Sequence, residues 1–439
     1  MRLRAVLLAL CIAHGVQSQN FFDSLAKGAT DIFNGFLGGG GGGGGSTNPC
    51  DQDAQKLYKD TQSVFYKRLY AKVAGHSDNH FVFSPYTVWL SLAALAEGAD
   101  PSVQRQLYSA LYLPQQQCLR HKFYYIALNV EKPGRDVSLQ RRRSLILDEG
   151  LQVNPTWTNF VHSTGILDVA FAPIKHSPSA TSNKLREFLR TRSNIVLKGN
   201  SVLLDALDFQ GLWTTAFADA NIFRAPFYND GRQQIGTVEM MKMKKRVRLA
   251  HVPFMSTKIV ELPVGENGRY SMLLAIGTGS NILEDAMNMF LGSVLEIFSA
   301  LHMTLVPIEI AIPRFSMSSE FDVRPALEEI GIDWFWRDPA ATSYVSHPAA
   351  MPGGLIQRVT IKIDSRGIEP PPSTSTGIFS RLVDLATDTA TGIASAVGHS
   401  FIADRPFMYA LFDTETHTCL LAGAFSRPSR RRRRCMDLY

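Results

Sequence analysis

The spacing of apolar side chains switches repeatedly between a helical and a strand period along residues 51–428. Residues 51–73 repeat apolar positions every three or four residues, which predicts an amphipathic helix. Residues 259–264 and 271–276 are short aliphatic runs separated by a glycine-containing turn, which predicts two strands. The pattern therefore predicts a mixed, α+β fold without internal repeats.

The N-terminal region has a different pattern. Residues 20–37 place phenylalanine, leucine and isoleucine at helical spacing, which predicts a short amphipathic helix. Residues 38–45 are eight glycines, which predict a flexible tether. A glycine-rich phosphate loop would need a strand before it and a helix after it, and Ser46-Thr47-Asn48-Pro49 follows instead.

Residues 1–18 have the pattern of a secretory signal peptide. Arg2 and Arg4 precede an apolar run over residues 5–13, and Val16-Gln17-Ser18 fits a cleavage site. No later stretch has about 18 uninterrupted apolar residues, as a membrane-spanning helix requires. We therefore expect a secreted, extracellular protein that is not transmembrane.

The formal charge of +6 is concentrated at the two ends of the chain. Residues 427–439 hold six arginines and one aspartate, and the rest of the expected mature chain is close to neutral. A terminal block of like charges stays solvated unless it meets a polyanion such as heparan-type polysaccharide. The alternative is a tail that a processing protease removes, and no sequence-specific nucleic-acid binding is expected. The polyanion-binding candidates are Arg430, Arg431, Arg432, Arg433 and Arg434.

Five cysteines are present, and Cys11 would leave with the signal peptide. Cys50, Cys118, Cys419 and Cys435 remain, an even number that is compatible with disulfides in an oxidising compartment. Four cysteines allow three pairings, and the sequence does not choose among them. Alternatively, Cys419 is a buried free thiol within an apolar strand.

The sequence lacks the common catalytic motifs. The chain has no His-Glu-x-x-His, Cys-x-x-Cys or Gly-x-Ser-x-Gly sequence. Gly277-Thr278-Gly279 begins a dinucleotide-like pattern but lacks its third glycine. We therefore expect no enzyme activity, no cofactor and no metal site.

Five stretches of the chain, spread over residues 51–428, form an ordered set of motifs. The most informative is Phe401–Leu411, which contains Asp404-Arg405-Pro406-Phe407. The other four are Asn79–Pro85 with the helix after it, Leu203–Phe217, Ile312–Ser316 and Leu327–Ile332. In order and spacing these stretches resemble the serpins, the serine-protease-inhibitor family, whose C-terminal signature matches Phe401–Leu411, and five matches together make the resemblance specific.

This resemblance implies a serpin fold, with a large mixed central sheet, further sheets, about nine helices and an exposed reactive loop. The expected organisation is a signal peptide at 1–18, an amphipathic segment with a glycine linker at 19–50, a serpin domain at 51–428 and an arginine-rich tail at 429–439. The reactive loop would span about 367–403. We expect a monomer.

In serpins the reactive loop is a bait that a protease cleaves and that then inserts into the main sheet. By resemblance, Gly367 opens the hinge and the cleaved bond lies about fourteen residues later, at Arg381-Leu382. Arginine before the cleaved bond suits a trypsin-like protease with a carboxylate in its specificity pocket. The resemblance thus predicts an extracellular serine protease as partner.

The hinge sequence argues against insertion. It runs Gly367, Ile368, Glu369, Pro370, Pro371, Pro372. A proline cannot donate a ladder hydrogen bond, and each unsatisfied partner in the interior costs about 1–3 kcal/mol. Trapping is a race between insertion and release of the cleaved product, so a slower insertion would let the protease escape.

Other departures from the family point the same way. Ile368 and Ser365 replace a threonine or serine and a glutamate, respectively, and Gln357 replaces a histidine. Asp205 stands where the family has asparagine, and Arg186 and Phe188 replace an asparagine and a tryptophan. We therefore expect that the polar network that lets the sheet open in serpins is not reproduced.

The loop is also about a dozen residues longer than is typical. Within it, residues 379–397 place apolar side chains at a helical period, which predicts a helix rather than a bait strand. The alternative is a flexible loop, because three threonines and Gly392 weaken a helix.

Three functional hypotheses follow. In the first, a serpin scaffold regulates extracellular serine proteases, or binds other partners through the loop, without irreversible trapping. In the second, the protein is a genuine suicide inhibitor cleaved at Arg381-Leu382. In the third, it is a non-inhibitory carrier or a polyanion-binding protein.

Overall fold

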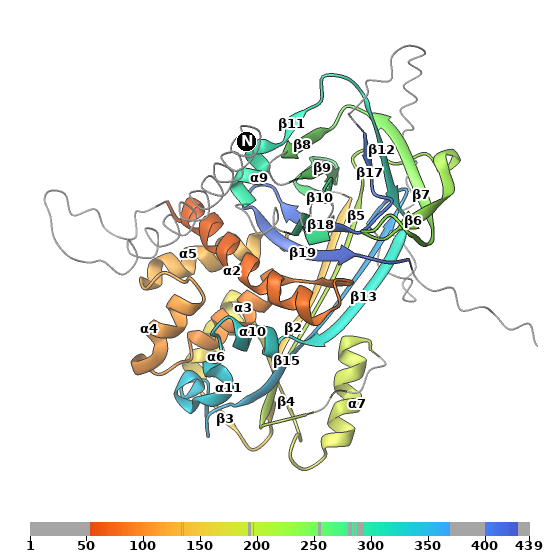
Figure 1. Cartoon of the computed structure of the whole chain (residues 1–439). Helices are drawn as coiled ribbons and strands as arrows, with labels where there is room; N and C mark the ends of the chain where they lie inside the picture. Colours follow the sequence, from red (N-terminus) through yellow and green to blue (C-terminus); the bar gives the residue numbers. More distant parts are fainter. Residues whose placement is uncertain are drawn as a thin grey trace, which may run out of the picture.

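The computed structural model describes residues 53–428, except 133, 135, 192–194, 196, 253–255, 280–282, 285, 288–293 and 369–399. In these residues, helices pack against the faces and ends of several sheets (Figure 1). The nine α-helices of the described part are α2 (Ala54–His76), α3 (Pro85–Ala96), α4 (Pro101–Ala110), α5 (Gln117–Asn129), α6 (Pro155–Thr164), α7 (Pro178–Leu189), α9 (Val294–Ala300), α10 (Arg324–Glu329) and α11 (Trp334–Arg337). Two short 3-10 helices are η2 (Asp219–Asn221) and η4 (Pro339–Thr342).

A six-stranded sheet runs the length of the molecule, in the order β13-β15-β16-β5-β2-β4. Its two central long strands, β5 and β15, are parallel, whereas β16 is antiparallel to both. The strands are β2 (Val137–Asp148), β4 (Asp168–Ala172), β5 (Ser201–Leu212), β13 (Phe315–Asp322), β15 (Pro352–Asp364) and β16 (Gly367–Ile368).

A seven-stranded sheet forms the centre of the core, in the order β1-β19-β18-β10-β9-β8-β11. Its pairings are antiparallel throughout. The strands are β1 (Phe81–Phe83), β8 (Arg248–Val252), β9 (Thr257–Val264), β10 (Tyr270–Gly277), β11 (His302–Met303), β18 (Phe407–Asp413) and β19 (Thr418–Phe425).

Two smaller sheets complete the described fold. The four-stranded sheet has the order β17-β12-β7-β6, and β14 pairs with β3 in a two-stranded ladder. The strands are β3 (Gln152–Val153), β6 (Ile222–Tyr228), β7 (Gln234–Lys245), β12 (Ile308–Pro313), β14 (Ser346–His347) and β17 (Phe401–Ile402).

Several helices begin with the same local device. The side chains of Ser84, Asp100 and Asn154 each accept a hydrogen bond from a backbone N–H of the first turn, and a proline follows each of them. This arrangement satisfies free N–H groups and uses the fixed φ of proline at the first helical position. Because all twelve residues of α3 are buried, α3 is an interior helix.

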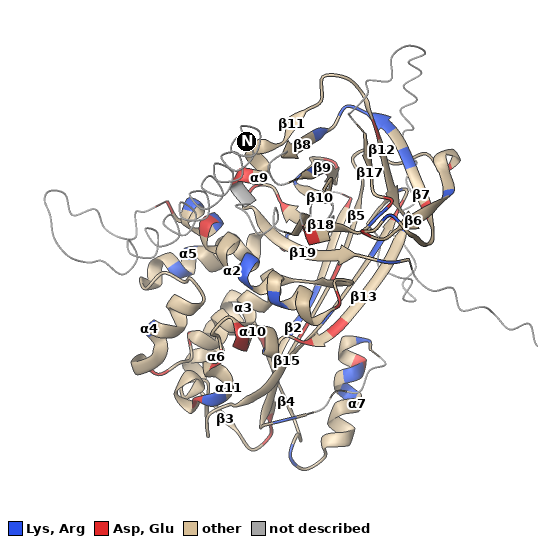
Figure 2. Cartoon of the chain, viewed as in Figure 1, with Lys and Arg blue, Asp and Glu red and all other residues tan. Residues whose placement is uncertain are grey.

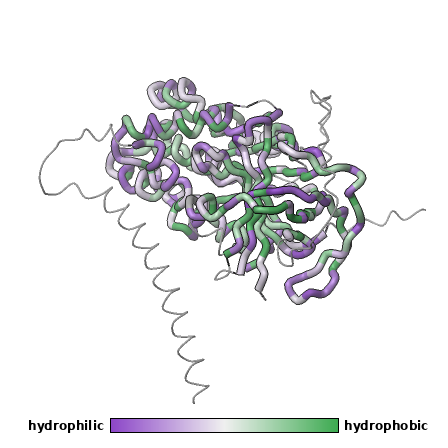
Figure 3. The backbone as a smooth tube through the Cα atoms, turned by 90° about the horizontal axis from the view of Figure 1, so that it is seen from above, coloured by the Kyte–Doolittle hydropathy of each residue, from purple (hydrophilic) through white to green (hydrophobic). Residues whose placement is uncertain are grey.

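The apolar positions gather in the middle of the molecule and the polar ones along its outer segments (Figure 3). One large cluster joins α2 and α3 to the seven-stranded sheet. A second, smaller cluster lies between α7 and the six-stranded sheet and includes Leu185, Leu189, Leu204 and Ala206. Both faces of the strand β5 are therefore covered.

The three elements that periodicity predicts within the described residues are confirmed. The helix predicted over 51–73 is α2, which begins at Ala54 because the Asp53 side chain caps it, and it continues to His76. The strands predicted at 259–264 and 271–276 are β9 and β10, which pair antiparallel. The mixed α+β class is confirmed as well. No helix in the described ranges is long and apolar enough to cross a membrane.

Candidate functional site: the hinge and the seam between β5 and β15

The first two residues of the predicted hinge form a strand of their own. Ser365 and Arg366 make a turn after β15, and Gly367–Ile368 then return as β16 between β15 and β5. Gly367 pairs with Leu212 of β5, and Ile368 pairs with Gly211. The chain thus enters the six-stranded sheet at its upper end and lies antiparallel to both neighbours.

Close packing explains why glycine stands at the start of β16. A Cβ atom on Gly367 would lie 2.1 Å from the carbonyl oxygen of Gly211 and 2.8 Å from the Cα of Leu212. Both are backbone atoms, so no side-chain rotation could relieve the contact. The next residue, Ile368, is fully buried. The apolar residue that replaces the family's threonine or serine is therefore used for packing.

The turn before the hinge is held by the segment that follows β5. The Trp213 backbone N–H donates to the Arg366 carbonyl at 2.9 Å, and its indole Nε1 donates to the Asp364 carbonyl at 2.9 Å. The Phe217 N–H donates to the Ser365 carbonyl, also at 2.9 Å. Trp213 and Phe217 are both buried. Three consecutive carbonyls of the turn are therefore fixed to one rigid support.

A polar cluster holds the other side of the turn. The Ser365 hydroxyl donates to Asp219 Oδ1 at 2.8 Å, and Arg314 Nη2 lies 3.0 Å from Asp364 Oδ2. Although burial alone would raise it, the pKa of Asp364 is lowered, because Arg314 and the Ser365 N–H donate to its carboxylate. The small Ser365 therefore fits a buried position where the family's glutamate would add a charge.

Below the hinge, β5 and β15 pair directly with each other. Their parallel register runs from Ser201 opposite Pro352 to Asp208 opposite Thr360, with an irregularity after Pro352. We call this strand pair the seam. The hinge strand pairs with Gly211 and Leu212, two residues beyond the end of the seam, so β5 and β15 are paired directly only from Ser201 to Asp208.

A buried polar cluster fastens the seam to α3. The Gln357 side chain accepts from the Ser84 N–H at 2.9 Å and donates back to the Ser84 carbonyl at 2.9 Å. Its Nε2 also donates to Asp205 Oδ2 at 2.7 Å and to Thr87 Oγ1 at 3.1 Å. The Thr87 hydroxyl donates to the same carboxylate oxygen of Asp205. We call these four residues the clamp.

A polar network is thus present at these positions, and it is built from the residues that depart from the family. Asp205 and Gln357 replace the family's residues at both of its positions, and the two replacements bond to each other across the seam. Each substitution looks like a loss when it is read alone. The pair keeps a donor opposite an acceptor, so the connection between β5 and β15 survives with a different chemistry.

The clamp contains a buried carboxyl group with a raised pKa. Asp205 is fully buried, and burial raises its pKa to about 6 against the hydrogen bonds from Thr87 and Gln357 and the charge of Arg143. Among the described residues, Asp205 Oδ1 and Thr360 Oγ1 are buried without a hydrogen-bond partner. The seam therefore carries polar groups that are only partly satisfied.

The helix α7 lies over the lower part of this sheet (Figure 1). Phe188 packs against the smaller apolar cluster, together with Ile356 of β15. Arg186 donates to Asn183 at 3.2 Å on the outer side of the helix. Of these two departures from the family, Phe188 thus supports the apolar contact between α7 and the seam, whereas Arg186 makes a local surface bond.

The far end of the reactive loop is also anchored in the described structure. Lys258 Nζ donates to the Ser400 carbonyl at 3.3 Å, and Phe401–Ile402 form β17. This strand pairs parallel with β12 at the edge of the four-stranded sheet. The loop therefore leaves from one sheet and returns to another.

The C-terminal signature has a structural role. Asp404 accepts a hydrogen bond from Arg405 Nε at 2.7 Å, and its carbonyl accepts from the Tyr228 N–H at 2.8 Å. Pro406 then leads into β18. Phe407 is fully buried and stacks on Phe425 with a centroid distance of 5.3 Å.

Several predicted features lie outside the described residues. These are Glu369, Pro370–Pro372, the bait pair Arg381-Leu382, the arginines 430–434 and the helices predicted at 20–37 and 379–397. Cys419 is a buried free thiol, as its alternative interpretation predicted, so none of the three pairings that use all four cysteines applies. Cys50 and Cys435 lie outside the described residues, and a disulfide among Cys50, Cys118 and Cys435 stays a prediction.

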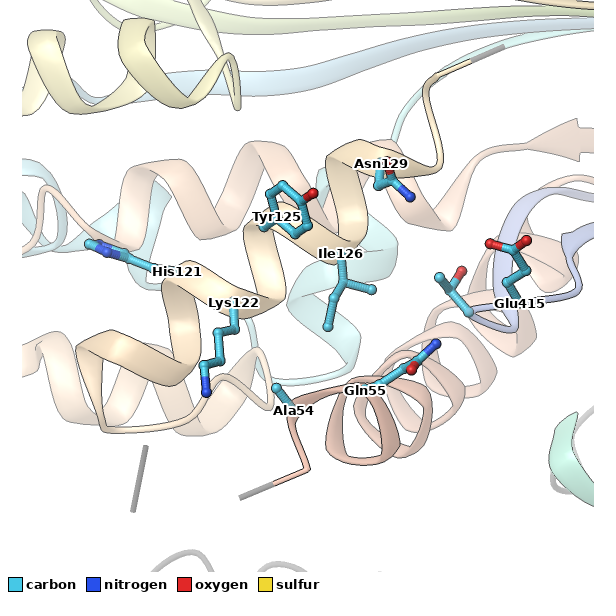
Figure 4. Close-up of a pocket in the computed structure, with 9 residues that line it drawn as sticks. Ala54, Gln55, His121, Lys122, Tyr125, Ile126, Asn129 and Glu415 are labelled. Atoms are coloured by element: carbon cyan, nitrogen blue, oxygen red, sulfur yellow. The ribbon is translucent and has the colours of Figure 1, made fainter. Parts of the chain in front are cut away.

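A hollow of about 580 Å³ opens between the N-terminus of α2, α5 and the turn before β19 (Figure 4). His121, Lys122, Tyr125 and Glu415 line it, and Tyr125 is 70% exposed. It shares no lining residue with the hinge or the clamp. A smaller, mostly apolar cavity lies beside Trp213 and Phe217.

The model of the family described as "Serpin (serine protease inhibitor)" matches residues 60–428. The chain therefore belongs to the serpin family. An uncharacterised serpin-like protein of Methanosarcina mazei is 24% identical over 83% of this chain and 84% of the relative. Serpin B5 of Xenopus tropicalis is 21% identical over 86% of this chain and 99% of the relative.

Solved serpin structures share the fold. The structure described as native protease nexin-1 with heparin has a TM-score of 0.68 and 17% identity, covering 86% of this chain and all of the other. The serpin fold expected from the sequence motifs is thus confirmed. Gly367 and Ile368 lie in β16 of the six-stranded sheet, and Phe407 of the signature begins β18 of the seven-stranded sheet; the functional roles predicted for these residues stay predictions. The contribution of Ser84 and Thr87 to the clamp was not foreseen, although both lie at the start of the helix that follows the Asn79–Pro85 motif.

Proposed function

We propose that this serpin is a secreted regulator of extracellular serine proteases that engages trypsin-like proteases, or other partners, through residues 367–403 without trapping them irreversibly. The observation that supports it is the register of β16 between β5 and β15. Ile368 lies opposite Gly211 of β5 and Ile363 of β15, so the path of any further inserted residue is determined.

Continuing this register places the prolines at defined positions. Residue 370 would come opposite Phe209 and Ile361, and residue 372 opposite Leu207 and Val359. Residues 371 and 372 would replace the two uppermost pairs of the seam. Three prolines in a row would supply no N–H to either neighbour, and each unpaired interior carbonyl costs about 1–3 kcal/mol.

The clamp lies on the same path. Residue 374 would come opposite Asp205 and Gln357, so insertion to that depth must separate the 2.7 Å hydrogen bond between them. An inserting loop would bring its three prolines into the sheet before it reached the clamp. Insertion thus meets an imino-acid block before the sheet is open, which favours release of a cleaved loop over capture of the protease.

One observation favours the alternative of a suicide inhibitor cleaved at Arg381-Leu382. Gly367 and Ile368 already occupy the place and direction of an inserted strand. The first two residues of the loop therefore already lie in the sheet, and trapping would require the residues after them to follow.

Incubation with trypsin, followed by a denaturing gel, separates the two functions. We expect cleavage of the loop without a covalent, shifted band. In a variant with Pro370, Pro371 and Pro372 replaced by alanine, we expect a covalent band to appear. A covalent band with the unaltered protein would contradict the proposal, and no change in the alanine variant would remove the prolines as its cause.

For the arginine-rich tail we propose binding to a heparan-type polyanion. The support is the block of five consecutive arginines, together with a fold relative whose structure is described as containing heparin. Heparin-column retention that falls with salt and is lost when Arg430–Arg434 become glutamines is the expected result. Equal retention of both forms would contradict it.

A further inference from the structure

A small cavity lies directly behind the support of the hinge turn. It measures about 210 Å³ and is bounded by the segment after β5, the ends of β7, β8 and β9, and β11. Its walls are mostly apolar and include Trp213, Phe217, Val247, Leu262 and Met303. Its size suits a molecule of roughly a dozen heavy atoms, below the usual range for drug-sized ligands.

The mouth of this cavity is positively charged. Lys245, Arg246 and Arg248 line it together with a single carboxylate, Glu261. Arg248 Nη1 lies 2.7 Å from Glu261 Oε2, so these two charges neutralise each other. Figure 2 shows the basic residues along β7 that lead to this end of the strand.

The other two cations bond only to neutral oxygens within the described part of the chain. Lys245 donates to the Thr215 hydroxyl, and Arg246 Nε donates to the Thr304 carbonyl at 2.9 Å. Both side chains are exposed at the rim. Two cations beside an apolar cavity are complementary to a molecule with an apolar body and one anionic end.

We propose that this cavity binds small carboxylic acids with an aryl or branched apolar body. The body occupies the space against Trp213, Leu262 and Met303, and the carboxylate faces Lys245 and Arg246. A neutral analogue of the same shape keeps the apolar contacts and loses the charge-assisted ones. The inference rests on the cavity alone and is independent of the proposed function of the loop.

The position of the cavity gives such binding a consequence. Trp213 and Phe217 form its wall and also donate the hydrogen bonds that hold the carbonyls of Asp364, Ser365 and Arg366. A bound acid would therefore contact Trp213, whose backbone and indole N–H groups both anchor the hinge turn.

Calorimetric titration of the full-length protein with 4-phenylbutanoate and with 4-phenylbutanamide tests the proposal. We expect the acid to bind about tenfold more tightly than the amide, since tenfold corresponds to one modest charge-assisted contact. The variant K245Q/R246Q should lose this preference and keep its affinity for the amide. The matched control is K244Q, because Lys244 lies on the same strand but faces the opposite side of the sheet from Met243 and Lys245.

A second variant replaces an apolar residue of the cavity wall by an acidic one. Met303 is 52% exposed, so Met303→Glu should fold normally and place a carboxylate at the mouth. It should weaken binding of the acid by about tenfold or more and affect the amide less. Equal affinity for acid and amide, no binding of the acid, or a preference that survives in K245Q/R246Q would each overturn the proposal.

Discussion

Two strand pairs of this serpin show opposite solutions to the same packing problem. In the pair β18–β19, antiparallel strands lie among buried aromatic side chains: Phe407, Tyr409, Phe412 and Phe425. In the seam between β5 and β15, parallel strands carry Asp205, Gln357 and Thr360 in equally buried positions. Both pairs share a backbone ladder, but the first packs aromatic rings around it, whereas the second adds side-chain hydrogen bonds between a few buried polar groups.

This difference has a physical consequence for movement. Aromatic side chains interlock at native packing density, so β18 and β19 cannot separate without creating a cavity. Entry of a strand would replace one set of hydrogen bonds in the seam by another, and two of the seam's polar atoms have no hydrogen-bond partner in the described residues. The cost of such an entry would therefore depend on individual residues of the seam.

The largest expected effect concerns the aromatic pair. Phe407→Ala should lower the free energy of unfolding by about 3–5 kcal/mol, because it leaves a cavity beside Phe315 and Phe425. Urea unfolding measures it. The control is Phe171→Ala on β4, a side chain that is 52% exposed and should cost less than about 1 kcal/mol. Similar losses of unfolding free energy in the two variants would contradict the view that β18 and β19 depend on their buried aromatic side chains.

The second effect concerns pH and the clamp. The pKa of Asp205 is about 6 in the folded protein, above its unfolded value near 4, so the folded state binds the proton more tightly. Its contribution to stability is therefore present below about pH 4 and is lost as pH rises through 6, by up to about 3 kcal/mol.

Urea unfolding at pH 4.5 and 7.5, with Asp205→Asn, measures this contribution. Between pH 4.5 and pH 7.5 the free energy of unfolding should fall less in the variant than in the unaltered protein. At pH 7.5 the variant should be the more stable of the two. Asp208→Asn is the control, since Asp208 lies on the same strand, is partly exposed and pairs with Arg142. An unchanged pH dependence in Asp205→Asn would show that the buried carboxyl does not titrate in this range.

The third effect concerns the hinge. Gly367→Ala places a methyl group against the backbone of Gly211 and Leu212, which should cost about 1–3 kcal/mol or expel Gly367–Ile368 from the sheet. Trypsin cleavage within residues 369–399 should then become faster. Gly134→Ala is a suitable control, because its Cβ would meet nothing within 4 Å. An unchanged cleavage rate and melting temperature would contradict the close contact.

The smallest expected effect concerns a single buried hydroxyl in the seam. Thr360→Val keeps the shape of the side chain and removes its buried, unpartnered hydroxyl. The variant should be more stable by about 1 kcal/mol, measured by urea unfolding. A destabilised variant would indicate that the hydroxyl contributes a bond to the seam.

Much of the fold could be predicted because its signals are local. The periodicity of residues 51–73 and the aliphatic runs at 259–264 and 271–276 define α2, β9 and β10 without reference to the rest of the chain. Likewise, the motif around Asp404 and Phe407 indicates the family, and Gly367 indicates where the predicted hinge begins.

The clamp could not be predicted in the same way. Asp205 and Gln357 are 152 positions apart, and each looks like a departure from the family when it is read alone. Only the parallel pairing of β5 with β15 brings the amide of one to the carboxylate of the other. A compensating pair is invisible in one sequence, because complementarity depends on contact and not on spacing.

By itself, the sequence determined which segments form helices and strands, the family to which they belong and the three prolines that follow the hinge. Only the folded structure shows that Gly367 must be glycine, that Ile368 is packed inside the sheet and that Asp205 is a buried acid with a raised pKa. The reason is physical: propensity and periodicity act over a few residues, whereas close contact, burial and pKa depend on neighbours that only folding brings together.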